Sequence, residues 1–151
     1  MMLPTHALVG IAVALPVALS VPELAPAALL GGFIGGVLPD LDLYAGHRKT
    51  LHYPTIYPIA AVPAAAFAFV QPTAGAVALA TALVGAALHC RMDIYGGGLE
   101  LEPWKGTSER AVYDHVRGEW RRPRRIVAYD GSRGDLAISA GLGVPLFLLL
   151  E

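Results

Sequence analysis

The sequence has few charged residues and a single cysteine, and both shortages limit what the protein can be. Only 15% of its 151 residues are charged, against roughly 25% in an ordinary soluble domain, whereas 55% are hydrophobic. The lone Cys90 excludes an internal disulfide and a CxxC thiolate metal site. The 11 basic and 12 acidic residues nearly cancel, so no basic field favours nucleic acid as a partner.

Charge is almost absent from three long runs. Residues 7–38 contain one charged side chain, Glu23, and residues 53–90 and 136–150 contain none. Prolines and the Gln71-Pro72-Thr73 turn divide these runs into five apolar segments, at about 7–21, 24–38, 54–70, 74–90 and 136–150. We therefore predict an all-α, polytopic helical membrane protein with four to five hydrophobic helices, folded as a single domain over residues 1–151.

The segment lengths leave alternatives open. Helices of about 15 to 18 residues reach about 22 to 27 Å, less than the hydrocarbon thickness of about 30 Å. The segment at 24–38 could therefore be re-entrant, and a soluble, very apolar helical bundle is the alternative fold. The segment at 24–38 contains four glycines, at 31, 32, 35 and 36, which form small-xxx-small pairs that favour close helix contact. The run at 7–19 has the length of a signal peptide, but no Lys or Arg precedes it, which favours a retained helix.

The basic residues predict an orientation in the cell membrane. Arg48 and Lys49 lie in the loop at 39–53, and the other nine lie in 91–135. Both stretches are therefore expected on the cytoplasmic face, with the C-terminus opposite if all five segments cross. We interpret 91–135 as a soluble juxtamembrane loop or lid of mixed structure, with a short helix at 107–116 and arginines near anionic headgroups.

Histidines and aspartates are predicted to gather at this same face. His89 and Asp93 are four residues apart, which places both on one side of a helix. Asp40 and Asp42 follow Pro39, and in an extended stretch both would point the same way. The topology adds His6, His47 and His52.

Imidazole and carboxylate together suit a divalent metal. We expect one or two ions, zinc first, with manganese or iron as alternatives. Each residue alone has an ordinary explanation as a helix cap, an interfacial residue or a positive-inside anchor. Ionisable residues clustered at a membrane surface are costly, so the set as a whole predicts a metal site.

Four motifs, in this order, resemble the YdjM-like inner-membrane, metal-dependent hydrolase family: "THALVG" at 5–10, "PDLD" at 39–42, "HRKTLH" at 47–52 and "GAALHCRMD" at 85–93. The resemblance covers about residues 1–104 and implies hydrolysis without naming a substrate. The resemblance also implies a set of polar signature residues, which Arg48 accompanies: His6, Asp40, Asp42, His52, His89 and Asp93. Leu51 stands where the family usually has threonine, which puts a supporting hydroxyl there in doubt.

These observations predict a hydrolase acting on a phosphoester of a lipid or lipid-linked molecule. The six signature residues are the predicted ligands, and Asp42 is also the predicted general base. Arg48 is expected to stabilise charge on phosphoryl oxygens, and His47 to protonate the leaving oxygen. Asp114 and His115 are expected in an exposed loop, with a general-acid role as the alternative. The competing function is a non-enzymatic metal-binding membrane scaffold, sensor or small transporter, which a closed coordination shell would favour. The sequence predicts no oligomeric state.

Overall fold

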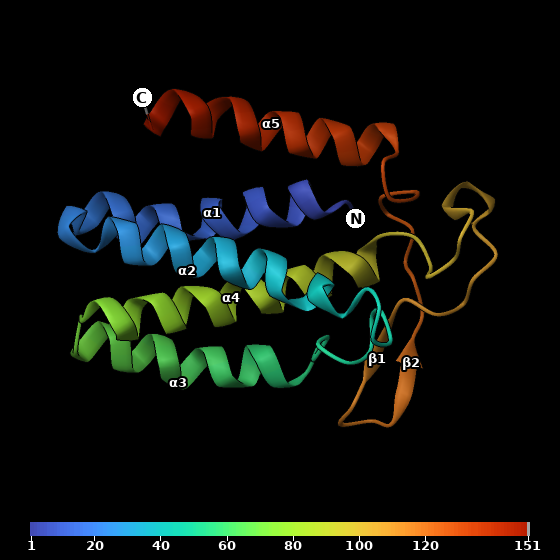
Figure 1. The fold of residues 1–151 in the computed structure, drawn as a ribbon, viewed down its shortest axis with the longest axis horizontal. Helices are drawn as coiled ribbons and strands as arrows, with labels where there is room; N and C mark the ends of the chain where they lie inside the picture. The colour runs from blue at the N-terminus through green and yellow to red at the C-terminus, as the bar shows by residue number, and fades with distance from the viewer. Residues whose placement is uncertain (151) are drawn as a thin grey trace.

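The computed structural model describes residues 1–150 and shows helices lying side by side in alternating directions (Figure 1). Within this range there are five α-helices: α1 (Leu3–Ser20), α2 (Ala25–Val37), α3 (Ile56–Val70), α4 (Ala74–Tyr95) and α5 (Arg133–Leu150). Three short 3-10 helices are η1 (Pro22–Leu24), η2 (Leu38–Asp42) and η3 (Pro103–Lys105). The predicted helical fold is confirmed, with every predicted segment present as a helix.

Helix ends follow from local chemistry. Pro4 and Pro26 lie in the first turns of α1 and α2, where a missing backbone N–H costs no helical hydrogen bond. Thr73 caps α4, because its Oγ1 accepts a hydrogen bond from the Ala76 amide at 3.3 Å. α4 continues to Tyr95, beyond the predicted end at residue 90, so the whole "LHCRMD" stretch is helical.

The helices have the composition and surface of membrane segments. Leu3–Ser20, Pro22–Asp42 and Ala74–Tyr95 are long and apolar enough to cross a bilayer, and α3 is a shorter apolar helix. Large apolar side chains such as Phe33, Ile59 and Phe69 are exposed, whereas the buried hydrophobic cluster consists of alanines and Val77. An exterior more bulky and apolar than the interior suits lipid and argues against the soluble bundle.

α2 packs closely against α1 and α4 through glycine. A Cβ atom on Gly32 would overlap the backbone of Gly10 in α1, and one on Gly35 would overlap the backbone of Ala82 in α4. Only a residue without a side chain permits this backbone approach. The predicted role of these glycines in close helix contact is confirmed.

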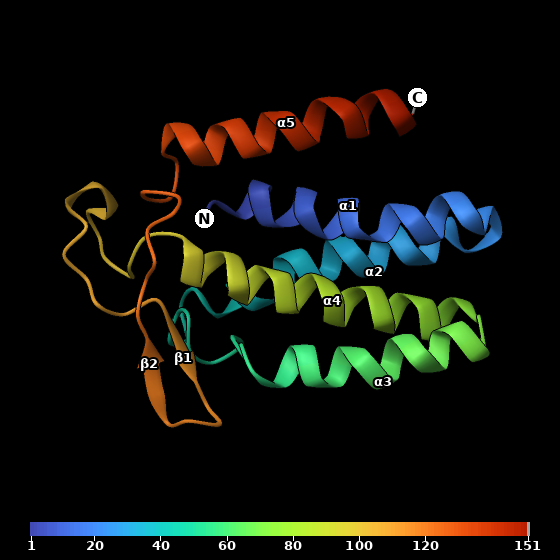
Figure 2. The same cartoon turned by 180° about the vertical axis from the view of Figure 1, so that it is seen from behind.

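One end of the molecule carries most of its polar structure. The N-terminus, the loop between η2 and α3, and the segment between α4 and α5 lie at this end, which we call the polar end (Figures 1 and 2). The segment includes an antiparallel hairpin of β1 (Val112–Asp114) and β2 (Glu119–Arg121). The predicted helix at 107–116 is therefore wrong. Val112 and Asp114 are buried in alternation, and Gly118 takes a positive φ of 68° at the turn.

The glycine contacts predict a specific sensitivity to a single methyl group. Gly32→Ala should destabilise the helical bundle by about 1 to 3 kcal/mol, because the new Cβ meets the Gly10 backbone. Gly75→Ala, also in a helix, is the matched control, since no atom lies within 4 Å of its added Cβ. Denaturant unfolding in detergent, followed by circular dichroism, measures both. Equal midpoints for the two variants would contradict the close α1–α2 contact.

Candidate metal centre

α4 contributes two buried side chains to the polar end. His89 and Asp93 lie one helical turn apart, and each is only 1% exposed. Nε2 of His89 is 3.3 Å from Oδ2 of Asp93. The i, i+4 spacing therefore places both groups on one face of α4, as expected from the sequence.

The two aspartates that follow α2 lie in η2, and their side chains point in different directions. The prediction of an extended stretch is wrong, because Leu38 takes helical angles (φ −50°, ψ −45°) and Pro39 fits the start of a 3-10 helix, where no N–H is needed. Residues two apart in a helix with three residues per turn point in different directions. Asp40 consequently faces His89, with Oδ1 at 3.4 Å from Nε2, and Asp42 faces His52.

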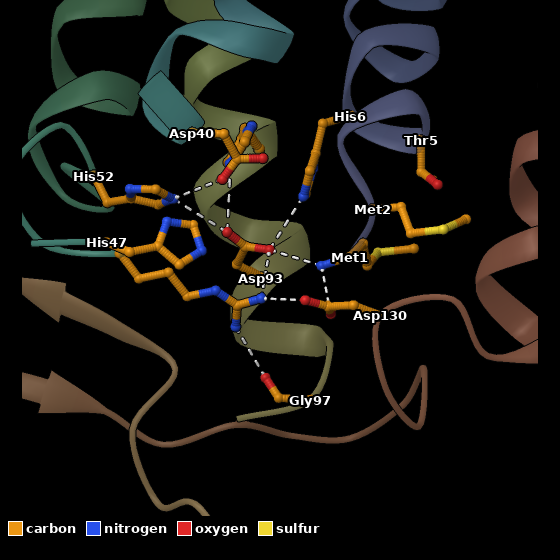
Figure 3. A network of polar contacts seen from close by, with 12 residues as sticks. Met1, Met2, Thr5, His6, Asp40, His47, His52, Asp93, Gly97 and Asp130 are labelled. Atoms are coloured by element: carbon orange, nitrogen blue, oxygen red, sulfur yellow. Dashed lines mark hydrogen bonds and ion pairs between the residues drawn. The ribbon is translucent and has the colours of Figure 1, made fainter. Parts of the chain in front are cut away.

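Four side chains form one compact group, which we call the four-residue group: Asp40, His52, His89 and Asp93. Each offers one ligand atom, and these atoms all lie within 4.8 Å of one another. Nε2 of His52 is 3.2 Å from Oδ2 of Asp93 and 3.8 Å from Oδ1 of Asp40. Ligands at about 2.0 to 2.1 Å from a tetrahedral ion are about 3.3 to 3.4 Å apart. The spacing and the donor types fit a divalent metal, and Figure 3 shows Asp40, His52 and Asp93 pointing toward one another.

The orientation of His89 supports the same conclusion. Its Nδ1 lies 2.7 Å from the carbonyl oxygen of Gly36, so this nitrogen carries the proton and donates it. Nε2 then faces the carboxylates of Asp40 and Asp93, at 3.4 and 3.3 Å. Among the described residues this buried nitrogen has no hydrogen-bond partner. A positive charge at this point, supplied by a metal ion or by a proton on Nε2, would stabilise the two carboxylates.

His52 is oriented by Asp42. Its Nδ1 lies 3.0 Å from Oδ2 of Asp42, which leaves Nε2 to face the four-residue group. Asp42 also accepts hydrogen bonds from the backbone amides of Leu51 and Arg48, at 3.0 and 3.3 Å. A carboxylate behind a histidine is a common support for metal-binding imidazoles. The structure places Asp42 in this supporting position and outside the four-residue group, and its predicted roles as ligand and general base stay predictions.

His6 lies on the other side of Asp93. Its Nε2 is 3.1 Å from Oδ1 of Asp93, and its ring stacks on His89 with centroids 3.7 Å apart. The amino group of Met1 lies 2.8 Å from the same oxygen (Figure 3). His6 therefore contacts the outer oxygen of Asp93 and does not join the four-residue group, so its predicted role as a ligand stays a prediction.

Arg48 is buried behind Asp93. Its Nη2 lies 3.6 Å from Oδ1 of Asp93 and 2.7 Å from Oδ2 of Asp130, and its Nη1 donates to the Gly97 carbonyl at 3.1 Å. Burial acts to lower the pKa of Arg48, but Asp93 and Asp130 raise it above its ordinary value, so the guanidinium stays charged. Sequence reasoning missed Asp130 as a partner, and its only signal was the Asp-Gly turn.

The remaining predicted residues lie around the edge of the site. His47 contacts Asp42 at 3.1 Å, and its side chain is 24% exposed, while that of Asp40 is 17% exposed. These two side chains therefore give the buried site access to solvent. His115 is exposed and lies 2.7 Å from the Lys49 carbonyl, whereas Asp114 is buried against Thr55, so this pair does not join the site.

The geometry predicts which side chains control metal content. His89→Ala and Asp93→Ala should each lose most bound divalent metal, because each removes a donor and breaks the four-residue group. His115→Ala should retain it, since this exposed histidine lies outside the four-residue group and contacts the Lys49 backbone carbonyl. Elemental analysis of purified, dialysed protein measures the metal. Wild-type metal content in the His89 variant would remove this site from consideration.

Comparison with known proteins adds a family to this geometry. A family model described as YdjM inner membrane protein matches residues 1–118. Searches of curated proteins and of solved structures gave no match. The matched range contains α1 to α4, all members of the four-residue group and strand β1. The chain therefore belongs to the YdjM inner membrane protein family.

Proposed function

We propose that this membrane protein is a metal-dependent hydrolase that cleaves a phosphoester of a lipid or lipid-linked molecule. The observation that supports it best is the compact, buried set of nitrogen and oxygen donors in which Nε2 of His89 and Nε2 of His52 face the carboxylates of Asp40 and Asp93. The residues that would hold the ion are Asp40, His52, His89 and Asp93. When bound, a divalent ion supplies Lewis acidity and water activation at neutral pH.

The surrounding residues provide proton transfer and support. Asp42 holds His52 through Nδ1 and contacts His47 through its other oxygen. This contact orients His47 beside the four-residue group, at the partly exposed edge of the site. We therefore assign His47 to protonation of the leaving oxygen, the role predicted from the sequence.

The contacts of Arg48 favour a positioning role. Its guanidinium is engaged by Asp93, Asp130 and the Gly97 carbonyl, so it holds Oδ1 of Asp93 and leaves Oδ2 to the four-residue group. Direct contact with a phosphoryl group, the role predicted from the sequence, would require some of these contacts to be replaced. Its positive charge still favours an anionic substrate. The membrane location favours a substrate that resides in the bilayer.

The number of donors also supports the competing function. Four protein ligands complete the shell of a four-coordinate zinc ion, as in structural zinc sites. A closed shell would suit a metal-binding scaffold, sensor or small transporter. Six-coordinate manganese or iron would keep positions for water and substrate beside the same four donors. The two functions therefore share one site and differ in whether a coordination position stays open.

A matched pair of variants tests the hydrolase. Purified protein in detergent is assayed on lipid phosphomonoesters, phosphodiesters and carboxyl esters, with and without chelator. We expect chelator-sensitive phosphoester cleavage, with kcat lowered about 100-fold or more in His47→Gln, because a positioned proton donor contributes roughly this factor. Metal content should be unchanged. Lys49→Gln, a change at an exposed neighbour, should keep most activity.

The other outcomes distinguish the alternatives. Cleavage of carboxyl esters alone would retain the hydrolase and discard the phosphoester. Metal-loaded protein that cleaves no substrate, with only protein ligands on the metal, would favour the scaffold, sensor or transporter. Unchanged kcat in His47→Gln would contradict the role of His47.

A further inference from the structure

A pocket lies at the polar end, on a different face of α4 from the four-residue group. It has a volume of about 440 Å³ and is formed where α3 begins and α4 ends, against the β1–β2 hairpin. Both overall views show the hairpin beside these helix ends (Figures 1 and 2). Its lining combines apolar side chains of α3 and α4 with three arginines, Arg91, Arg117 and Arg121. The volume lies within the range of about 300 to 1,000 Å³ that is common for small-molecule sites.

α4 separates this pocket from the four-residue group. Arg91 is two residues from both His89 and Asp93, a rotation of about 200° around an α-helix. Accordingly, Arg91 is exposed whereas His89 and Asp93 are buried. Leu88 and Ile94 are three residues from Arg91 on either side and line the same pocket. The pocket is therefore a separate site.

The polar side of the pocket has an excess of positive charge. The lining contains three guanidinium groups and one carboxylate, that of Asp114, which lies 3.3 Å from Arg121 and 3.9 Å from Arg117. Burial acts to raise the pKa of Asp114, but hydrogen bonds from Thr55 and nearby backbone amides hold it below its ordinary value, so this carboxylate is charged. Glu119, which is exposed and is not a lining residue, lies 4.0 Å from Arg117.

Arg91 is the least compensated of the three arginines. Among the described residues no carboxylate forms an ion pair with Arg91. Its guanidinium lies 5.5 Å from the centroid of the Tyr95 ring. Its position near the end of a membrane-spanning helix places it at the depth of lipid headgroups. The pocket therefore offers cationic groups to an anion at the membrane surface.

The other side of the pocket suits hydrocarbon. Pro58 and Ile59 of α3 and Ala87 and Leu88 of α4 form its apolar wall, and Ile59 is 67% exposed. These residues belong to apolar helices that continue away from the polar end. A ligand that matches both sides must carry an anionic head and an apolar chain.

We propose that this pocket binds an anionic phospholipid, with its phosphate among Arg91, Arg117 and Arg121 and an acyl chain along Ile59 and Leu88. The proposal does not depend on the metal or on hydrolysis. Electrostatic attraction near a membrane surface contributes about 1 kcal/mol per basic residue, which corresponds to about fivefold in affinity. Removal of one arginine should therefore weaken binding by roughly this factor.

Native mass spectrometry of the full chain in detergent tests the proposal. Phosphatidylglycerol and phosphatidylcholine with identical chains are titrated against wild type, Arg91→Gln, Arg117→Gln and Arg122→Gln. The Arg122 variant is the matched control, because this arginine is 82% exposed, pairs with Glu109 and does not line the pocket. We expect wild type to prefer phosphatidylglycerol, each pocket variant to bind it about fivefold more weakly, and Arg122→Gln to match wild type.

Three results would overturn the proposal. Equal affinity for the two lipids would exclude recognition of the anionic head, and an equal loss in Arg122→Gln would show only general surface charge. Binding of sn-glycerol 3-phosphate as tight as that of phosphatidylglycerol, measured by calorimetry, would show a site for a free phosphate ester. Arg117 lies on the hairpin, so its variant decides the outcome if Arg91→Gln disturbs α4. Metal content measured in the same samples keeps this test separate from the metal centre.

Discussion

Burial of the Asp93 carboxylate at the end of a membrane helix is the constraint on which the polar end depends. A charged carboxylate removed from water is costly unless cations or hydrogen-bond donors surround it. Its two oxygens meet different partners, with Oδ2 facing His52 and His89 and Oδ1 facing His6 and Arg48. These partners come from α1, from the loop after η2 and from α4 itself, so one carboxylate draws together three separate parts of the chain.

Helix packing sets the position of the partners. Glycines allow the backbone of α2 to approach α1 and α4, and the carbonyl of Gly36 thereby reaches Nδ1 of His89. α2 continues directly into η2, so the same contact places Asp40 beside the histidine. On the opposite side, the Tyr113 amide donates to the Arg48 carbonyl at 2.9 Å and ties the hairpin to the Arg48 loop. The bundle and the hairpin together position the side chains that surround Asp93.

The features that could be predicted from the sequence are those that depend on short-range patterns of residues. Apolar runs predicted the helices because length and composition alone decide whether a helix suits a membrane, and i, i+4 spacing predicted that His89 and Asp93 share a face. The division between Asp40 and Asp42 was missed because Pro39 was interpreted as ending the helix, although a 3-10 helix accepts it. The hairpin was missed because each of its strands has only three residues, too few to show an alternating pattern. The Arg48–Asp130 pair was missed because it joins residues 82 positions apart.

X-ray absorption spectroscopy at the edge of the bound metal tests the central claim most directly, because it reports ligand type and distance together. Asp40, His52, His89 and Asp93 predict two imidazole nitrogens and at least two oxygens at about 2.0 to 2.2 Å, with no sulfur. The multiple-scattering signal from the two histidine rings should be weaker in His52→Ala, because this variant lacks one of the two rings. A metal ligated by sulfur from Cys90, or by oxygen atoms without any imidazole, would contradict the proposed centre.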